Sequence, residues 1–213
     1  RLLESDVPLT KVRALYDEMT LPAGNKGAIR ERIRSLRRGF DMAWVEQASP
    51  LILEKVVALP QFSAARVVSC YMALPHEVQT EELIEMCWQL GKRVCVPALL
   101  KGSHEYELSW LEPGDATVQG PVKIPQPRDI RRVQPKDVNL MIVPAMAFDR
   151  RGNRLGHGCG HYDRLMAKCP GYKVGLVFEV QMVDEVPVEA LDVAVDIVVT
   201  EQNIYPPASV RGG

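Results

Sequence analysis

The residues best suited to chemistry are gathered in one glycine-rich stretch. Residues 152–164 read GNRLGHGCGHYDR, with four glycines in nine positions, shortly after the apolar run NLMIVPAMAF. Glycines let backbone N–H groups approach an anion closely, and the amino end of a following helix adds partial positive charge. The stretch is not a P-loop, because no Gly-Lys-Ser/Thr follows it, and its GxGxG alternation differs from the GxGxxG dinucleotide fingerprint. It predicts a phosphate-binding loop, with a flexible turn as the alternative interpretation.

A second set of candidate residues is basic and lies near the start of the chain. Lys26, Arg30, Arg34 and Arg37 are separated by steps of four, four and three residues. On a helix this spacing places them along one face. Arginine can hold phosphate oxygens through two parallel hydrogen bonds, so the stripe predicts a polyphosphate clamp. A solvated helix face paired with Glu31 and Asp41 is the alternative interpretation.

Helices and strands alternate along the chain and must position both sets of residues. Apolar residues at helical spacing predict helices over 26–47, capped by Asn25, over Ser49–Leu59, over 80–92 and from about His161 to Lys168. Runs rich in β-branched and apolar residues predict strands at 65–74, 92–99, 105–111, 139–148, 172–178 and 195–201. Residues 112–136, rich in proline, glycine and charge, are expected to form a surface loop.

This alternation predicts an α/β fold: a single three-layer domain with a mostly parallel open sheet covered by helices on both faces. Residues 25–205 are expected to form that domain, with 1–24 as an N-terminal arm or leader and 206–213 as a tail. Open parallel sheets bind ligands beyond the carboxyl ends of their strands. The glycine loop leaves its strand at that end, and Asp196 reaches the same crevice if the sheet bends the start of the last strand into it.

Composition excludes several classes of protein. The 213 residues carry a net charge of −1, which argues against a general nucleic-acid coat or a membrane-surface protein. No apolar run approaches the roughly 20 residues that span a bilayer, and no secretory leader is visible, so we expect a cytoplasmic protein. Five scattered cysteines, mostly in apolar segments, are typical of reduced intracellular thiols.

Six motifs occur in an order that resembles a known family. They are KGAIR at 26–30, HEVQT at 76–80, GKRVCVP at 91–97, IPQP at 124–127, FDRRGNRLGHGCGHYDR at 148–164 and VDIVVTE at 195–201. Together they resemble the 5-formyltetrahydrofolate cyclo-ligases, also called methenyltetrahydrofolate synthetases, over residues 26–205. The resemblance implies an ATP- and magnesium-dependent ring closure of 5-formyltetrahydrofolate to 5,10-methenyltetrahydrofolate, with release of ADP and phosphate. It also implies small-molecule partners only, namely ATP and a reduced folate, and we expect a monomer that binds neither nucleic acid nor membrane.

The resemblance also implies roles for residues at matching positions. Asp163 and Asp196 match magnesium-binding carboxylates, in keeping with the preference of that metal for oxygen ligands. Glu77 matches the acidic residue that holds the edge of the pterin ring. The implied catalytic residues are Arg154 and Tyr162. The implied nucleotide contacts are Lys26, Arg30, Arg154, Leu155, Gly156, His157, Gly158, Cys159, Gly160, His161 and Tyr162. The implied folate contacts are Met72, Glu77, Tyr106, Val122, Gly158 and His161.

The chain departs from the family pattern inside the loop. His157, Cys159 and His161 stand where relatives carry small, basic or aromatic residues, so the substrate is less securely implied than the fold. One alternative is a diverged ATP-binding relative acting on another formyl or carboxylate compound. A second is a nucleic-acid-binding module built on the basic stripe. A third is a zinc site of His157, Cys159 and His161, although ligands one residue apart are not the usual zinc spacing.

Overall fold

The computed structural model describes residues 25–100, 102–103, 105–121 and 123–206. The expected arm 1–24, the folate contact Val122 and tail residues 207–213 lie outside the described residues. The helices are α2 (Lys26–Arg38), α3 (Met42–Val57), α4 (Pro60–Ala64), α5 (Glu81–Gln89) and α6 (His161–Lys168), with 3₁₀ turns η1 (Pro135–Asp137) and η2 (Glu179–Gln181). In the described part of the chain, none of them has the length and apolar character of a membrane span.

The first two helices differ from the prediction. Asn25 caps α2 as expected, its side chain accepting from the backbone N–H of Gly27 at 2.8 Å. The predicted helix over 26–47 is wrong, because α2 ends at Gly39 and Asp41 caps a new helix. That helix, α3, runs through Pro50 in its interior. Glycine at a helix end and aspartate two residues later are stop and start signals that outweigh continuous apolar spacing.

The twelve strands of the described residues form one large sheet and two small ones. The large sheet has eight strands in the order β12-β11-β10-β7-β1-β2-β3-β6. The run from β11 to β2 is parallel, whereas β12, β3 and β6 pair antiparallel at the edges. The prediction of a mostly parallel sheet is confirmed. The strands are β1 (Val67–Ser69), β2 (Arg93–Leu99), β3 (Tyr106–Leu111), β4 (Thr117–Gln119), β5 (Pro125–Pro127), β6 (Arg132–Val133), β7 (Leu140–Pro144), β8 (Ala147–Phe148), β9 (Arg154–Leu155), β10 (Tyr172–Leu176), β11 (Ile197–Val199) and β12 (Ile204–Tyr205).

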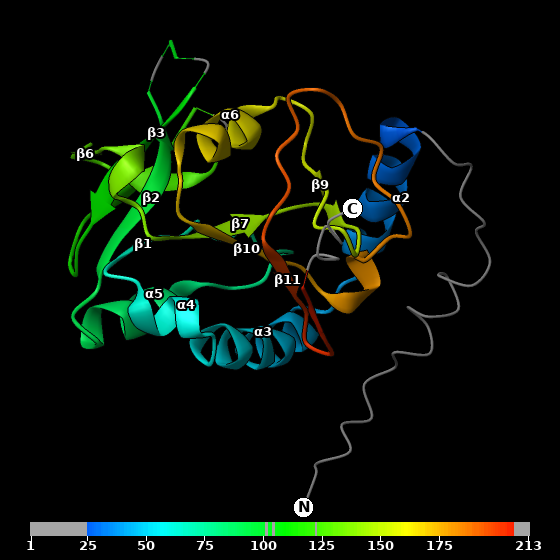
Figure 1. The fold of residues 1–213 in the computed structure, drawn as a ribbon, viewed down its shortest axis with the longest axis horizontal. Coiled ribbons are helices and arrows are strands. Elements are labelled where there is room, and N and C mark those ends of the chain that lie inside the picture. Colours follow the sequence, from blue (N-terminus) through cyan, green and yellow to red (C-terminus); the bar gives the residue numbers. More distant parts are fainter. Residues whose placement is uncertain (1–24, 101, 104, 122, 207–213) are drawn as a thin grey trace, which may run out of the picture.

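Helices cover both faces of the sheet, as predicted. Figure 1 shows α3, α4 and α5 along one face and α6 on the other. The apolar core is divided accordingly: Ile52 of α3 and Leu83 of α5 belong to one buried cluster, and Leu165 of α6 belongs to a second. The expected surface loop 112–136 contains the β4–β5 hairpin and the edge strand β6.

A β-hairpin that was not predicted from the sequence leads into the glycine loop. The apolar run at 139–148 is two strands, β7 and β8, and β8 turns back to pair with β9. Asp149 makes that turn: its buried carboxylate accepts from the backbone N–H groups of Arg151 and Asn153 at 2.9 and 3.0 Å. The hairpin packs under α2 in a third buried cluster that includes Ile29 and Ile33. The loop and α2 are therefore held beside each other.

Candidate active site

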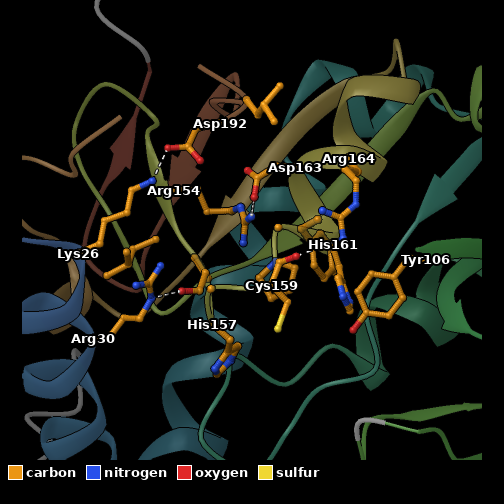
Figure 2. Close-up of a pocket in the computed structure, with 18 of the residues that line it drawn as sticks. Lys26, Arg30, Tyr106, Arg154, His157, Cys159, His161, Asp163, Arg164 and Asp192 are labelled. Carbon is orange, nitrogen blue, oxygen red and sulfur yellow. Dashed lines mark hydrogen bonds and ion pairs between the residues drawn. The ribbon is translucent and has the colours of Figure 1, made fainter. Parts of the chain in front are cut away.

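A cavity of about 980 Å³ lies beyond the carboxyl ends of β1 and β7. This is the edge where parallel sheets bind ligands. The glycine loop crosses it, α2 and the segment 187–192 border one side, and β3 and α6 border the other (Figure 2). Residues that are far apart in the sequence therefore share one lining.

Lys26 of α2 is held at the cavity by two carboxylates. Its ammonium group lies 2.6 Å from Asp192 and 2.9 Å from Glu189. The same oxygen of Asp192 accepts from the backbone N–H of Glu189 at 2.8 Å, which closes the turn that carries both acids. Burial lowers the pKa of Lys26, but the hydrogen bonds that it donates to Asp192 and Glu189, together with their negative charges, outweigh this effect, and the pKa is raised. Lys26 is therefore a fixed positive charge.

Arg30 joins α2 to the glycine loop. Its Nε donates to the backbone oxygen of Gly156 at 2.9 Å. Gly158 and Gly160 have φ angles of 109° and 64°, a region in which a side chain would be strained. Gly160 is also the residue from which α6 begins, so its left-handed conformation turns the loop into the helix. These contacts connect the loop to α2 at one end and to α6 at the other.

Arg154 lies at the centre of the lining. Its Nη2 is 2.6 Å from the Asp163 carboxylate in the first turn of α6, and its side chain is only 5% exposed. The guanidinium also lies over the ring of Tyr162, 5.5 Å from the centroid. Burial raises the pKa of Tyr162 well above its ordinary value, so this hydroxyl stays protonated and cannot act as a base near neutral pH.

The opposite side of the cavity is aromatic and carries one buried acid. The Tyr106 ring meets His161 and Tyr162 edge to face, with centroids 5.2 and 5.5 Å apart. Met72 lines the same region. Glu77 is 8% exposed and accepts from the backbone N–H of Leu74 at 3.1 Å. The cavity thus has a cationic, glycine-rich side and a mostly aromatic side that carries the Glu77 carboxylate.

Comparison with known proteins matches this arrangement to one family. The model of the 5-formyltetrahydrofolate cyclo-ligase family matches residues 22–201. The chain belongs to the 5-formyltetrahydrofolate cyclo-ligase family. The 5-formyltetrahydrofolate cyclo-ligase of Escherichia coli (strain K12) is 32% identical over 183 residues, covering 81% of this chain and 98% of that protein. The Mus musculus cyclo-ligase is 27% identical over 193 residues, covering 84% and 93%.

A solved structure agrees with the family assignment. The NMR structure of 5,10-methenyltetrahydrofolate synthetase from Aquifex aeolicus aligns with a TM-score of 0.78 at 29% identity. The alignment covers 88% of this chain and 95% of that chain. The fold and the recognition of the cyclo-ligase family from six motifs are therefore both confirmed.

The structure brings nearly all of the sequence-predicted cyclo-ligase residues together. Every predicted nucleotide contact lines the cavity, as do the predicted folate contacts other than Val122, which is not described. Asp163 lines it as well. The lining residues that were predicted are Lys26, Arg30, Met72, Glu77, Tyr106, Arg154, Leu155, Gly156, His157, Gly158, Cys159, Gly160, His161, Tyr162 and Asp163.

Asp196 is the predicted residue that the structure does not bring to the cavity. It directly precedes β11, at the amino end of the strand, and its carboxylate accepts from the backbone N–H of Lys173 at 2.7 Å. Because β11 runs parallel to β10, with Val174 opposite Ile197, its amino end lies at the sheet edge opposite to the carboxyl ends that border the cavity. The acids that the preceding segment 187–192 supplies to the cavity are Glu189 and Asp192.

Three functional candidates were missed or misread in the sequence. Asp192 belongs to no motif, and only its contact with Lys26 marks it. Arg164 donates to the backbone oxygen of Cys159 at 3.1 Å and so fastens the loop to α6. Arg37 was grouped with the basic stripe of α2, yet it is buried. Its place four residues after Ile33 and eight after Ile29, which are also buried, could have signalled this, because steps of four stay on one helix face.

Metal ligation by the loop histidines receives no support. Within the described residues, no group of three or more His, Cys, Asp or Glu side chains is placed to hold a metal ion. His157 and Cys159 line the cavity without forming such a group with His161. The zinc hypothesis for these three residues is therefore disfavoured. Magnesium has a different requirement, since it keeps several waters and commonly takes only one or two protein carboxylates beside substrate phosphates.

Proposed function

We propose that this chain catalyses the ATP- and magnesium-dependent cyclisation of 5-formyltetrahydrofolate to 5,10-methenyltetrahydrofolate, releasing ADP and phosphate. The observation that carries the proposal is the two-sided cavity. A cationic, glycine-rich side and an aromatic side with a buried acceptor face each other across one space. A member of the cyclo-ligase family needs such a pair of sites, because the reaction joins a phosphate donor to a reduced folate.

The cationic side fits a triphosphate. Lys26, Arg30 and Arg154 come from α2 and from β9, and all three line the cavity next to the loop glycines. Charge-assisted hydrogen bonds to phosphate are the strongest polar contacts that a protein offers. Each cation is paired with a carboxylate or a carbonyl within the protein. Phosphate oxygens compete for these donors, and the freed carboxylates are then available to a cation.

The residues present fit magnesium through the same exchange. Asp163 is paired with Arg154, and Asp192 is paired with Lys26, both at 2.6 Å. Either carboxylate supplies the hard oxygen ligand that magnesium takes together with phosphate and water. When bound, magnesium neutralises charge on the β- and γ-phosphates during transfer. Asp163 is the better placed of the two, because it lies beside Arg154 at the start of α6.

The aromatic side fits the pterin ring. Tyr106, Tyr162 and Met72 offer flat apolar surface, and Glu77 offers an acceptor for N–H donors on the edge of the ring. Few polar groups with fixed positions are typical of small-molecule sites. Glu77 is fixed by the Leu74 N–H, so its orientation is set before a ligand arrives.

The chemistry requires positioning and charge stabilisation rather than a base. The formyl oxygen attacks the γ-phosphorus, a C–O–P linkage forms, and the bond from the γ-phosphorus to the bridging oxygen breaks to release ADP. The neighbouring folate nitrogen then attacks the activated carbon, loses its proton, and phosphate departs with the former formyl oxygen. Arg154 and Lys26 stabilise the transferring group, while Tyr162 orients Arg154 through its ring.

An isotope experiment tests the proposal directly. The protein is incubated with ATP, magnesium and 5-formyltetrahydrofolate that carries ¹⁸O in the formyl group, and the released phosphate is analysed by mass spectrometry. We expect one ¹⁸O atom in each phosphate, with one methenyl product formed for each ADP. Unlabelled phosphate would mean that water, and not the formyl oxygen, attacks ATP, which would overturn the proposed reaction.

A further inference from the structure

Arg37 lies behind the wall of the cavity. It belongs to the last turn of α2, and its Nη2 donates to the backbone oxygen of Ala145 at 2.5 Å. Its Nη1 lies 3.7 Å from Oε1 of Glu77, and the two side chains are 11% and 10% exposed. Glu77 and Ala145 line the cavity, whereas Arg37 does not. Arg37 can therefore affect a ligand through its contacts with these two neighbours.

The pair is a buried charge pair at the aromatic side. A guanidinium does not lose its proton in proteins, and an unpaired buried charge is strongly unfavourable. Among the described residues, Glu77 is the carboxylate that an ion pair joins to Arg37. The other oxygen of Glu77 accepts from Leu74 N–H. Glu77 is thus held from two directions, by its own segment and by α2.

We propose that Arg37 is a positioning residue for folate recognition: it keeps Glu77 oriented as a carboxylate toward the pterin and ties that side of the cavity to α2, which carries the phosphate-binding cations. This inference rests on the proposed function, because it assigns Glu77 to the folate. It also explains why α2 is fastened by Arg37 to the β7–β8 turn through Ala145. A shift of the end of α2 that carries Lys26 and Arg30 would then also move Glu77, the acid that binds the folate.

The surroundings of Glu77 make its charge depend on Arg37. Burial raises the pKa of Glu77, and Arg37 together with the Leu74 N–H opposes that rise without cancelling it. The other groups that face it are the hydroxyls of Tyr71, Tyr106 and Tyr162, whose own pKa values are raised, so they remain neutral. Removing the Arg37 charge therefore raises the pKa of Glu77 further. Folate affinity, which needs the carboxylate, is then lost at a higher pH than in the unaltered protein.

The test is calorimetric titration with 5-formyltetrahydrofolate between about pH 6 and pH 8.5. At pH 6.5, Arg37→Met should bind the folate roughly ten- to a hundredfold more weakly, the usual loss for a charged hydrogen-bonded contact. The deficit should shrink toward pH 8.5. Arg37→Lys, which keeps the charge, should retain most of the affinity and the original pH profile. The affinity of both variants for a non-hydrolysed ATP analogue should stay within about twofold, since Lys26 and Arg30 are unchanged.

The pKa of His157 also responds to Arg37. A second experiment, made in a Glu77→Gln variant, therefore distinguishes the effect of Arg37 on Glu77 from its effect on His157. In Glu77→Gln, the further change Arg37→Met should cost little folate affinity and add no pH dependence, because the group it acts on is gone. If Arg37→Met alone fails to fold, this double variant, which removes both buried charges, should fold again.

Two results would overturn the inference. One is an equal, pH-independent loss of folate and ATP-analogue affinity in Arg37→Met, which would mark a merely structural residue. The other is the same loss in the Glu77→Gln background as in the unaltered protein. A protein that binds no 5-formyltetrahydrofolate at all would instead overturn the proposed function, and the role of Arg37 with it.

Discussion

At the scale of single residues, His157 illustrates how the surroundings of a side chain in the cavity shift its pKa. Burial lowers the pKa of His157, and the charges of Arg37, Arg34, Arg154 and Arg30 lower it further. The neutral imidazole is therefore more favoured in the free protein than it is for an unperturbed histidine. A bound triphosphate reverses the sign of the local field and favours the imidazolium. On the proposed function, we therefore expect His157 to gain a proton when the triphosphate binds.

His157 should show this reversal in an NMR titration of its imidazole. In the free protein we expect a pKa below the ordinary value of about 6.5, and a rise when a non-hydrolysed ATP analogue is added. His157→Gln identifies the signal by removing it. A pKa at or above the ordinary value in the free protein, or no movement on adding the analogue, would show that the imidazole does not feel the phosphate site.

Asp163 should account for the effect of magnesium on nucleotide affinity. Removing magnesium with a chelator should weaken binding of the ATP analogue to the unaltered protein, because the triphosphate then faces Asp163 and Asp192 without a counter-ion. Asp163→Asn should remove most of this dependence on magnesium in calorimetric titrations. Asp196→Asn is the matched control and should keep it, because Asp196 pairs with the Lys173 backbone outside the cavity lining. Loss of the magnesium effect in Asp196→Asn alone would support the sequence-based assignment instead.

At the scale of elements, α2 and the glycine loop work as a pair. The helix supplies Lys26 and Arg30 from its first turns, and the loop supplies backbone groups whose path is fixed by positive φ angles. The contact between Arg30 and the Gly156 oxygen joins the two. A buried cluster beneath them holds α2 on the β8–β9 hairpin, so their spacing is set by packing rather than by the ligand.

Replacing either cation of α2 should weaken nucleotide binding without unfolding the protein. Lys26→Ala and Arg30→Ala should each cost about 1.5–3 kcal/mol in binding the ATP analogue, the usual worth of a hydrogen bond to a charged group. Arg38→Ala is the matched control on the same helix, because Arg38 is exposed and bonds Ser35. Its affinity should not change. If Lys26→Ala and Arg30→Ala both bind as tightly as the Arg38 variant does, α2 is not part of the nucleotide site.

Local sequence signals predicted the elements whose causes are local. The Asn25 cap and α6 follow from their own neighbours, and His161–Lys168 was predicted as it is observed. The break at Gly39 was missed because apolar spacing continues into α3, whereas the cap at Asp41 interrupts it. The β8–β9 hairpin was missed because Asp149 builds its turn from contacts that include Val186, which lies far along the chain.

At the scale of the whole molecule, the order of the strands decides which residues meet. β7 lies between β1 and β10, so Tyr71 and Met72 after β1 reach the same cavity as Pro144 at the end of β7. The motifs identified most of these residues because the family pattern carries them together. Asp192 and Arg37 escaped because their roles arise from tertiary contacts, with Lys26 in one case and Glu77 in the other. Asp196 was misplaced for the converse reason, since a matching motif does not tell which end of a strand faces the ligand.

The central claim is that the two sides of the cavity carry out one reaction. The most direct test follows the absorbance of 5,10-methenyltetrahydrofolate after the protein is mixed with 5-formyltetrahydrofolate, ATP and magnesium. We predict steady formation of the methenyl product that requires ATP and that falls by roughly a hundred- to a thousandfold in Arg154→Met, the typical cost of losing one charge contact to the transition state. ATP-analogue binding with no methenyl product, even at high protein concentration, would contradict it.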